Sequence, residues 1–168
     1  PNAGQLKRLA KAYKPAQDDL EECPITQLKY PLDDRERQSM PAGGLFSTAA
    51  DLSIFYRMIA NGGVFAGKRI LSEQAVQQMT TKQTGELPTP YGLGFSTGGG
   101  QIGHGGAYGT NSSLDRERGL ITIFLVQHAG WSKDGKLVLP AFQKAAVEAF
   151  GQKSPATPRA EYRKGWSL

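Results

Sequence analysis

Residues 103–110 (GHGGAYGT) place one of the two histidines of this chain among glycines. Small residues on both sides of a strand residue let a substrate lie flat against the strand edge. A backbone N–H after such a turn can point at a developing oxyanion, so Ala107 is a candidate donor and His104 a candidate substrate contact. Hairpin turns around a hydrogen-bonded strand histidine would give the same pattern, and the residue types alone leave both interpretations open.

A second pattern, GFSTG at residues 94–98, matches the nucleophile-elbow motif G-x-S-x-G. Ser96, Asp115 and His128 also follow one another in the order serine, acid, histidine. The motif needs a helix directly after the serine, and the segment TGGGQIGHGG is too rich in glycine to form one. The context therefore argues against an elbow at Ser96.

Metal chemistry has weak support in these residues. The two histidines lack His-x-x-x-His spacing, and the single cysteine, Cys23, excludes both a cysteine-based zinc cluster and an internal disulfide. We therefore expect no metal and no cofactor.

The elements that must position these residues are predicted by apolar periodicity. The segment STAADLSIFYRMIANGG predicts a helix with Thr48 as its N-cap and Asn-Gly-Gly as its stop. A shorter helix is expected after Ser72, and LVLPAFQKAAVEAFG predicts another that ends at Gly151. Strands are predicted at residues 91–96, 100–105, 108–117 and 119–128.

This order of elements predicts an α+β fold in which an antiparallel sheet is flanked by helices. LITIFLV is apolar enough for a central strand that is covered on both faces. We expect an irregular, proline-containing lead-in at residues 1–40, the helices and sheet at 41–151, and a basic extended tail at 152–168. The helices supply one layer over the sheet comfortably and a second one poorly, which predicts that the chain is part of a larger unit.

Charge and hydropathy exclude two classes of partner. The net charge of +5 is concentrated at the two ends of the 168 residues, and no basic face is interleaved with aromatic residues. We therefore expect no nucleic-acid binding. No apolar run approaches the roughly 18 residues that span a bilayer, so no transmembrane segment is expected. No signal peptide is visible in this chain.

Three segments together resemble the C-terminal portion of the serine β-lactamase-like family. They are PAGGLFSTAADLSIFYRMIANGG, YGLGF, and GHGGAYGTNSSLD followed by LITIFLVQ, and they cover about residues 41–150. The family includes class C β-lactamases, D-Ala-D-Ala carboxypeptidase-type penicillin-binding proteins and related esterases. The resemblance implies the C-terminal part of a β-lactamase/transpeptidase-like fold, and acyl-enzyme chemistry on a small-molecule ester, amide or β-lactam.

The resemblance also implies roles for individual residues. Members of the family combine a Ser-x-x-Lys nucleophile, a Tyr-x-Asn base region and a Lys-Thr-Gly-like triad on a strand edge. By resemblance, His104, Gly105 and Gly106 form the triad, Tyr108 joins them in substrate binding, and Ala107 supplies an oxyanion-hole N–H. No serine here is followed by lysine three residues later, and no tyrosine by asparagine two residues later. We therefore expect no nucleophile in this chain, and no activity from the chain alone.

Several alternatives follow from the missing nucleophile. A complementary N-terminal half or a second copy of the chain would cover the sheet, or the chain is a non-catalytic scaffold or interaction module from a split or degenerate gene. A histidine in the triad is mostly neutral at pH 7, unlike a lysine, which predicts a preference for neutral esters or amides over β-lactams. Likeness to many family members would place the protein in the periplasm or outside the cell, but the residues leave its compartment open.

Overall fold

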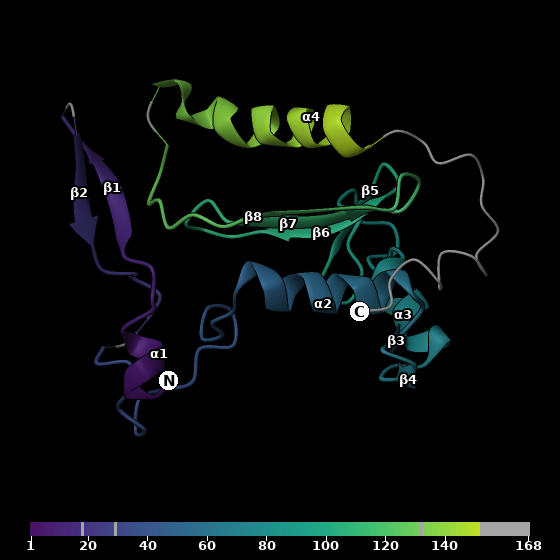
Figure 1. Ribbon diagram of the computed structural model, residues 1–168, viewed down its shortest axis with the longest axis horizontal. Coiled ribbons are helices and arrows are strands. Elements are labelled where there is room, and N and C mark those ends of the chain that lie inside the picture. Colours follow the sequence, from purple (N-terminus) through teal and green to yellow (C-terminus); the bar gives the residue numbers. More distant parts are fainter. Residues whose placement is uncertain (18, 29, 132, 152–168) are drawn as a thin grey trace.

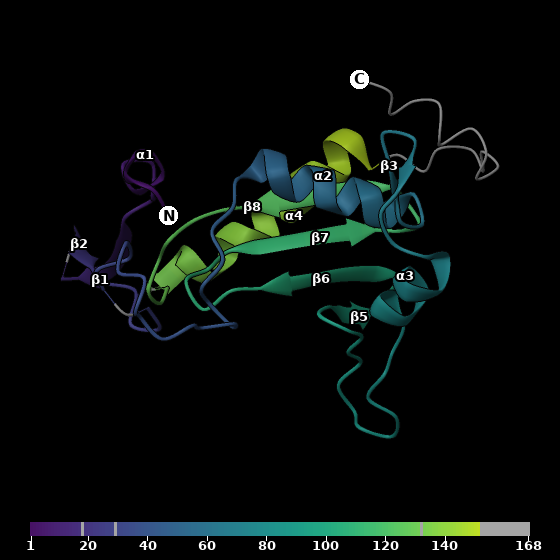
Figure 2. The ribbon, with the colours of Figure 1, turned by 90° about the horizontal axis from the view of Figure 1, so that it is seen from below.

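An antiparallel sheet of four strands in the order β5-β6-β7-β8 lies at the centre of the computed structural model. Its strands are β5 (Ser96–Gly98), β6 (Gln101–Gly105), β7 (Asn111–Asp115) and β8 (Leu120–Phe124). Helix α2 (Ala49–Ala60) lies on one face of the sheet and α4 (Val138–Phe150) on the other (Figures 1 and 2). This arrangement confirms the predicted α+β fold, an antiparallel sheet with flanking helices.

The structure describes residues 1–17, 19–28, 30–131 and 133–151. Shorter elements surround the sheet: α1 (Ala3–Leu6), β1 (Ala12–Ala16), β2 (Asp19–Cys23), β3 (Val64–Phe65), β4 (Lys68–Arg69), α3 (Glu73–Thr80) and the 3₁₀ helix η1 (Lys133–Leu137). The basic tail expected at residues 152–168 lies outside the described residues.

Residues 1–40 are less irregular than the sequence predicted. The structure places α1 and the antiparallel hairpin of β1 and β2 in this segment. The hairpin carries an ion pair between Lys11 and Glu22, 2.6 Å long. Pro15 is tolerated in β1 because one edge of a two-stranded hairpin needs no N–H donor. Apolar alternation, which would have revealed these strands, is absent from the segment.

Local signals account for both ends of α2. The Thr48 hydroxyl accepts a hydrogen bond from Asp51 N–H at 3.1 Å and donates one to the Asp51 carboxylate at 2.8 Å. After the last turn, Gly62 and Gly63 adopt φ values of +62° and +92°, which glycine reaches without steric cost. The predicted helix is therefore confirmed, with the predicted N-cap and stop.

The apolar core lies between α2 and the sheet. Tyr56, Ile59, Ile102 and Leu114 are at most 4% exposed. Burial raises the pKa of the Tyr56 phenol, whose hydroxyl donates to Ser112 O at 2.9 Å. The hydroxyl is thereby satisfied inside the core, as a buried polar atom has to be. The other members of this core are Met58, Val76 and Phe95.

The face of the sheet under α4 is more polar and more loosely covered. Phe142 packs against Phe124 with ring centroids 5.3 Å apart, but no residue of α4 is buried. Ser113 and Thr122 bond to each other across β7 and β8 at 2.8 Å on this face. Helix α4 therefore covers the second face of the sheet but packs against it loosely.

Two strand predictions were wrong. Residues 91–96 were expected to form a strand, but Gly92 N–H bonds to Phe95 O at 2.8 Å and Gly94 has φ +91°, so the chain turns before β5 begins. β8 was expected to be central, and it is an edge strand. Its apolar composition reflects cover from α2 and α4 on its two faces, because burial of both faces does not require a strand on each side.

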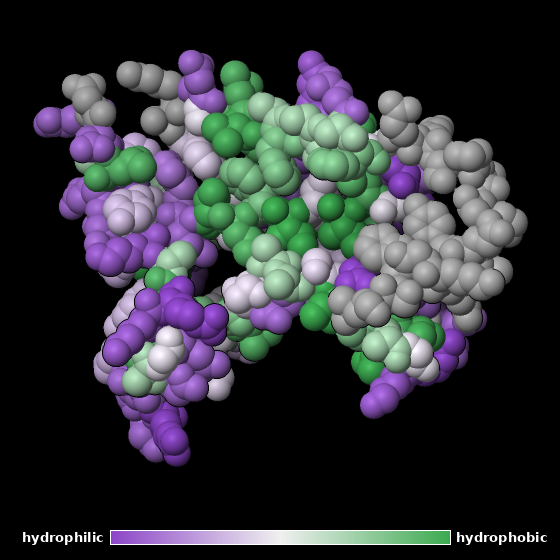
Figure 3. Space-filling view, in the orientation of Figure 1, coloured by the Kyte–Doolittle hydropathy of each residue, from purple (hydrophilic) through white to green (hydrophobic). Residues whose placement is uncertain are grey.

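The outer edge of β8 opens into a groove of about 510 Å³. Figure 3 shows hydrophobic side chains gathered over α4, β8 and α2 on this side of the molecule. The Phe150 side chain, 77% exposed, lies on the rim at the end of α4. The groove is lined by Ser53, Arg57, Gly119, Leu120, Ile121, Ile123 and Phe150.

The carboxyl group of Asp115, the last residue of β7, makes the stability of the folded chain depend on pH. Burial would raise the pKa of its carboxyl, but hydrogen bonds from the backbone and guanidinium of Arg118 and from Glu117 N–H lower it overall. The folded-state pKa therefore lies below the unfolded value of about 3.9. The resulting stabilisation is present above about pH 4 and is lost as pH falls through the folded-state pKa.

We expect an Asp115→Asn variant to lack this component of acid sensitivity. Urea unfolding between pH 2.5 and 7 should show the wild-type free energy of unfolding falling toward that of the variant as the pH drops below about 4. A constant difference between the two proteins across this range would contradict the assignment.

Candidate active site

Within the described part of the chain, the strand that carries His104 has an unpaired stretch along its outer edge. On one side, β6 pairs with β7 as far as its own residue Gly105. On the other side, β6 pairs with β5 only as far as Gly103. β5 is short because the turn at Gly94 diverts the preceding chain from the sheet. Past Gly103, the edge of β6 is therefore open to a second extended chain.

Backbone hydrogen bonds define which groups face this open edge. Gly106 N–H donates to Thr110 O at 2.7 Å, and Arg116 N–H donates to Gly100 O at 3.2 Å. In an antiparallel ladder, every second residue pair exchanges backbone hydrogen bonds. Because Gly100 and Gly106 both bond to the β7 side, the even-numbered residues of β6 bond to β7 and the odd-numbered ones point away from it. The N–H and C=O of Gly105 consequently point to the open edge.

Ala107 follows directly, in the β-turn that joins β6 to β7. The residue is exposed, and within the described part of the chain its N–H makes no hydrogen bond. The turn itself is closed by Gly109 N–H, which donates to Gly106 O at 3.0 Å. The Ala107 N–H is therefore free to bind a ligand.

The His104 ring is exposed beside this edge. It lies edge-on to Tyr91, with ring centroids 5.7 Å apart and an interplanar angle of 88°. Its Nδ1 lies 2.5 Å from Gly105 O. A carbonyl oxygen only accepts hydrogen bonds, so Nδ1 carries a hydrogen in this contact.

The glycines around His104 serve different purposes. A Cβ on Gly103 would overlap the backbone oxygen of Ser112, so the hairpin requires glycine there. A Cβ on Gly106 would overlap the Thr110 hydroxyl, which would have to move. At Gly105 a Cβ would meet nothing closer than 3.7 Å. Close packing of the hairpin therefore explains Gly103, while Gly105 lies where the edge is open.

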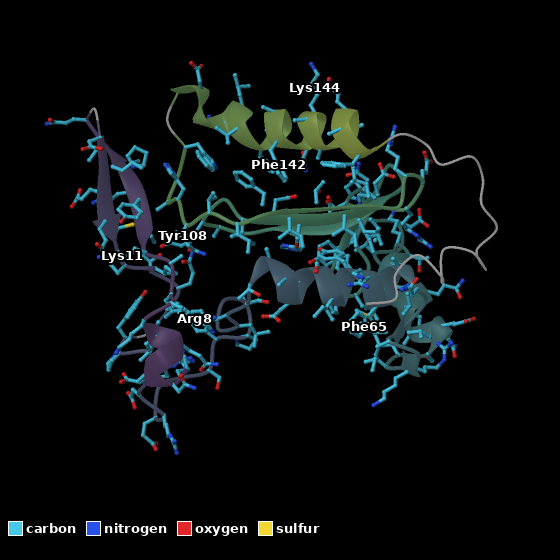
Figure 4. All side chains as sticks on the ribbon, viewed as in Figure 1. Arg8, Lys11, Phe65, Tyr108, Phe142 and Lys144 are labelled. Carbon is cyan, nitrogen blue, oxygen red and sulfur yellow. The ribbon has the colours of Figure 1, made fainter. Side chains whose placement is uncertain are left out.

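The Tyr108 side chain extends toward the lead-in segment (Figure 4). Its phenol oxygen accepts a hydrogen bond from Thr26 N–H at 2.8 Å and donates one to Pro24 O at 3.3 Å. The turn is thereby bonded to residues that precede it by more than 80 positions.

The structure does not bring the serine–acid–histidine set together. Asp115 is bound by Arg118, on the part of β7 that lies opposite Gln101. His128 lies at the other end of the sheet, where its N–H bonds to Tyr108 O at 2.8 Å. Ser96 therefore has neither partner of a triad. In the described ranges, no group of three His, Cys, Asp or Glu side chains could hold a metal ion.

Comparison with known proteins identifies the family. A family model described as Beta-lactamase matches residues 1–146. The chain belongs to this family. The match confirms the resemblance seen in the sequence, and it also takes in the lead-in segment.

Two curated relatives of this Beta-lactamase-family chain come from Mycobacterium tuberculosis. They are "Uncharacterized protein MT1414" of strain CDC 1551 / Oshkosh and "Protein Rv1367c" of strain ATCC 25618 / H37Rv. Each is 33% identical over 113 residues, which cover 51% of this chain and 28% of the relative. The matched part thus spans less than a third of either relative. Among the described residues, no helix is long and apolar enough to cross a membrane.

Several residues that contact His104 and the turn after β6 were not predicted from the sequence of this Beta-lactamase-family chain. Tyr91 was assigned to a strand and not to the surroundings of His104. Thr26 was part of a supposedly irregular segment, and Trp131 had no assigned role. An aromatic residue next to a glycine turn was the only local signal for Tyr91, and nothing local connected Thr26 with Tyr108.

Proposed function

We propose that this chain supplies the C-terminal part of a serine hydrolase active site that works through an acyl-enzyme. The open edge of β6 carries the proposal, because it leaves the Gly105 backbone and the Ala107 N–H available beside the exposed His104. The nucleophilic serine and its bases would come from a part of the protein outside these 168 residues, or from a complementary chain.

Each exposed group would have a distinct task in the reaction. The substrate acyl chain would lie along β6 and bond to the Gly105 N–H, and to the Gly105 C=O through the lone pair that His104 Nδ1 does not use. When the serine oxygen bonds to the acyl carbon, the carbonyl oxygen becomes negative and Ala107 N–H donates to it. The intermediate then expels its leaving group, and water later cleaves the acyl-serine bond.

His104 would define the class of acyl substrate. When the ring is neutral and its hydrogen is on Nδ1, Nε2 would accept a hydrogen bond from a substrate N–H or O–H. A neutral ring attracts a substrate carboxylate less than a lysine ammonium does. We therefore propose that the enzyme favours neutral esters or amides over β-lactams.

A fluorophosphonate probe, which labels activated serines, tests the proposed division of the site. We expect the intact mass of this chain alone to show no adduct. A protein that also contains the Ser-x-x-Lys segment should gain one adduct, on that serine. A stoichiometric adduct on this chain alone that disappears in Ser96→Ala would overturn the proposal. Absence of an adduct in both proteins would favour the non-catalytic scaffold.

A further inference from the structure

The residues on both sides of Ala107 are held within the turn. Gly106 is bonded to Thr110 through its N–H and to Gly109 through its carbonyl. Gly109 has φ +82°, a conformation that favours glycine. These contacts determine the shape of the turn, but its orientation relative to the sheet and the lead-in depends on contacts with other segments.

The Tyr108 phenol makes one such contact. Thr26 N–H donates to it at 2.8 Å, and it donates to Pro24 O at 3.3 Å, so it is both an acceptor and a donor. The Thr26 hydroxyl lies 3.4 Å away as a third polar neighbour. The phenol thus connects the turn after β6 to the segment that follows β2.

The main chain of Tyr108 is held from another direction. Its carbonyl accepts from His128 N–H at 2.8 Å. The His128 ring stacks on Trp131 with centroids 4.3 Å apart and planes inclined by 7°. The Trp131 indole in turn leaves no room for a Cβ on Gly109. Contacts with Thr26, Pro24, His128 and Trp131 therefore fix both Tyr108 and the residue after it.

We propose that Tyr108 is a positioning residue that holds the Ala107 N–H where the oxyanion forms. The proposal rests on the proposed function, because it requires that N–H to act in catalysis. Hydrogen-bond donors to an oxyanion stabilise it only if their position is fixed to within about 0.5 Å. Tyr108 directly follows Ala107, so movement of its backbone would displace the donor without removing it.

Tyr108→Phe tests this role in the protein that carries the nucleophile. We expect kcat for a small ester to fall about five- to tenfold, because the hydrogen bonds of the phenol with Thr26 and Pro24 are lost, with little change in KM. In the 168-residue chain itself, deuterium exchange of the Thr26 amide should become about tenfold faster, because its acceptor is gone.

A second variant removes the same hydrogen bond from the other side. Thr26 occupies the second position of a turn closed by Leu28 N–H and Ile25 O at 3.0 Å, a position that favours proline. Thr26→Pro also places the proline Cδ where the N–H points at the Tyr108 phenol, 2.8 Å from the nitrogen, so the phenol must move. Its kcat should therefore fall at least as far as that of Tyr108→Phe. Tyr30→Phe is the matched control, since among the described residues the Tyr30 phenol accepts a hydrogen bond from Ile25 N–H in the same segment at 3.3 Å and makes no other. Its kcat should match that of the wild type.

The outcomes separate this proposal from the function on which it rests. An unchanged kcat in Tyr108→Phe, with accelerated exchange at Thr26, would overturn the positioning role. A higher KM at constant kcat would also overturn it, and would make Tyr108 a substrate contact. Unimpaired turnover in Ala107→Pro would instead overturn the proposed function, and the positioning role with it.

Discussion

Ala107→Pro should reduce turnover by a factor of about 100 to 1,000 in the protein that carries the nucleophile, whereas Ala107→Gly should keep most of it. Proline has no N–H, so the variant cannot donate to the oxyanion, and loss of one such donor raises the barrier by roughly 3 kcal/mol. Glycine retains the donor. Steady-state kinetics with a neutral ester would measure both variants.

The turn accommodates proline at position 107 without loss of a structural hydrogen bond. Ala107 is the second residue of the turn closed by Gly109 N–H and Gly106 O, where proline is favoured. Its own N–H makes no hydrogen bond among the described residues, so no structural bond is lost. Thermal unfolding of the variant should resemble that of the wild type. Normal turnover in a folded Ala107→Pro protein would exclude Ala107 as the oxyanion donor.

Leu114→Ala should strongly destabilise the fold. The Leu114 side chain is 3% exposed and packs in the core under α2. Truncation of such a leucine costs about 2–5 kcal/mol through lost burial and the remaining cavity. A small domain has only about 5–15 kcal/mol of stability in total, so a large part of it would be lost. Urea unfolding monitored by circular dichroism would measure the change.

Leu20→Ala is the matched control, because the same atoms are removed from a side chain that is 51% exposed. We expect its free energy of unfolding to change by less than about 0.5 kcal/mol. Equal effects of the two substitutions would show that Leu114 does not lie in a packed core.

Elements with strong local signals were predicted well from the sequence. The helix at Ala49–Ala60 has a capping threonine, an apolar face and a glycine stop, all within one short segment. The strand that carries His104 was also predicted, since residues 100–105 nearly coincide with Gln101–Gly105. In both cases the deciding interactions join residues that are close in sequence.

The incorrect and missed predictions concern features that depend on contacts between residues far apart in the sequence. The apolar sequence of β8 indicates that both faces of this strand are covered, but it does not indicate which strands lie beside β8 in the sheet. The open edge at His104 depends on where β5 begins, and that follows from the turn at Gly94. The bond between Tyr108 and Thr26 joins residues 82 positions apart, and no periodic pattern describes such a contact.

The outer edge of β8 also affects how this chain behaves in solution. Because odd-numbered residues of β7 bond to β8, the backbone groups of Ile121 and Ile123 point outward, beside the apolar groove. Leu120–Phe124 contains no lysine or proline, the residues that commonly discourage edge-to-edge association. An edge of this kind is a template for aggregation unless another strand covers it. Self-association of the isolated chain would therefore compete with the assembly of a complete active site.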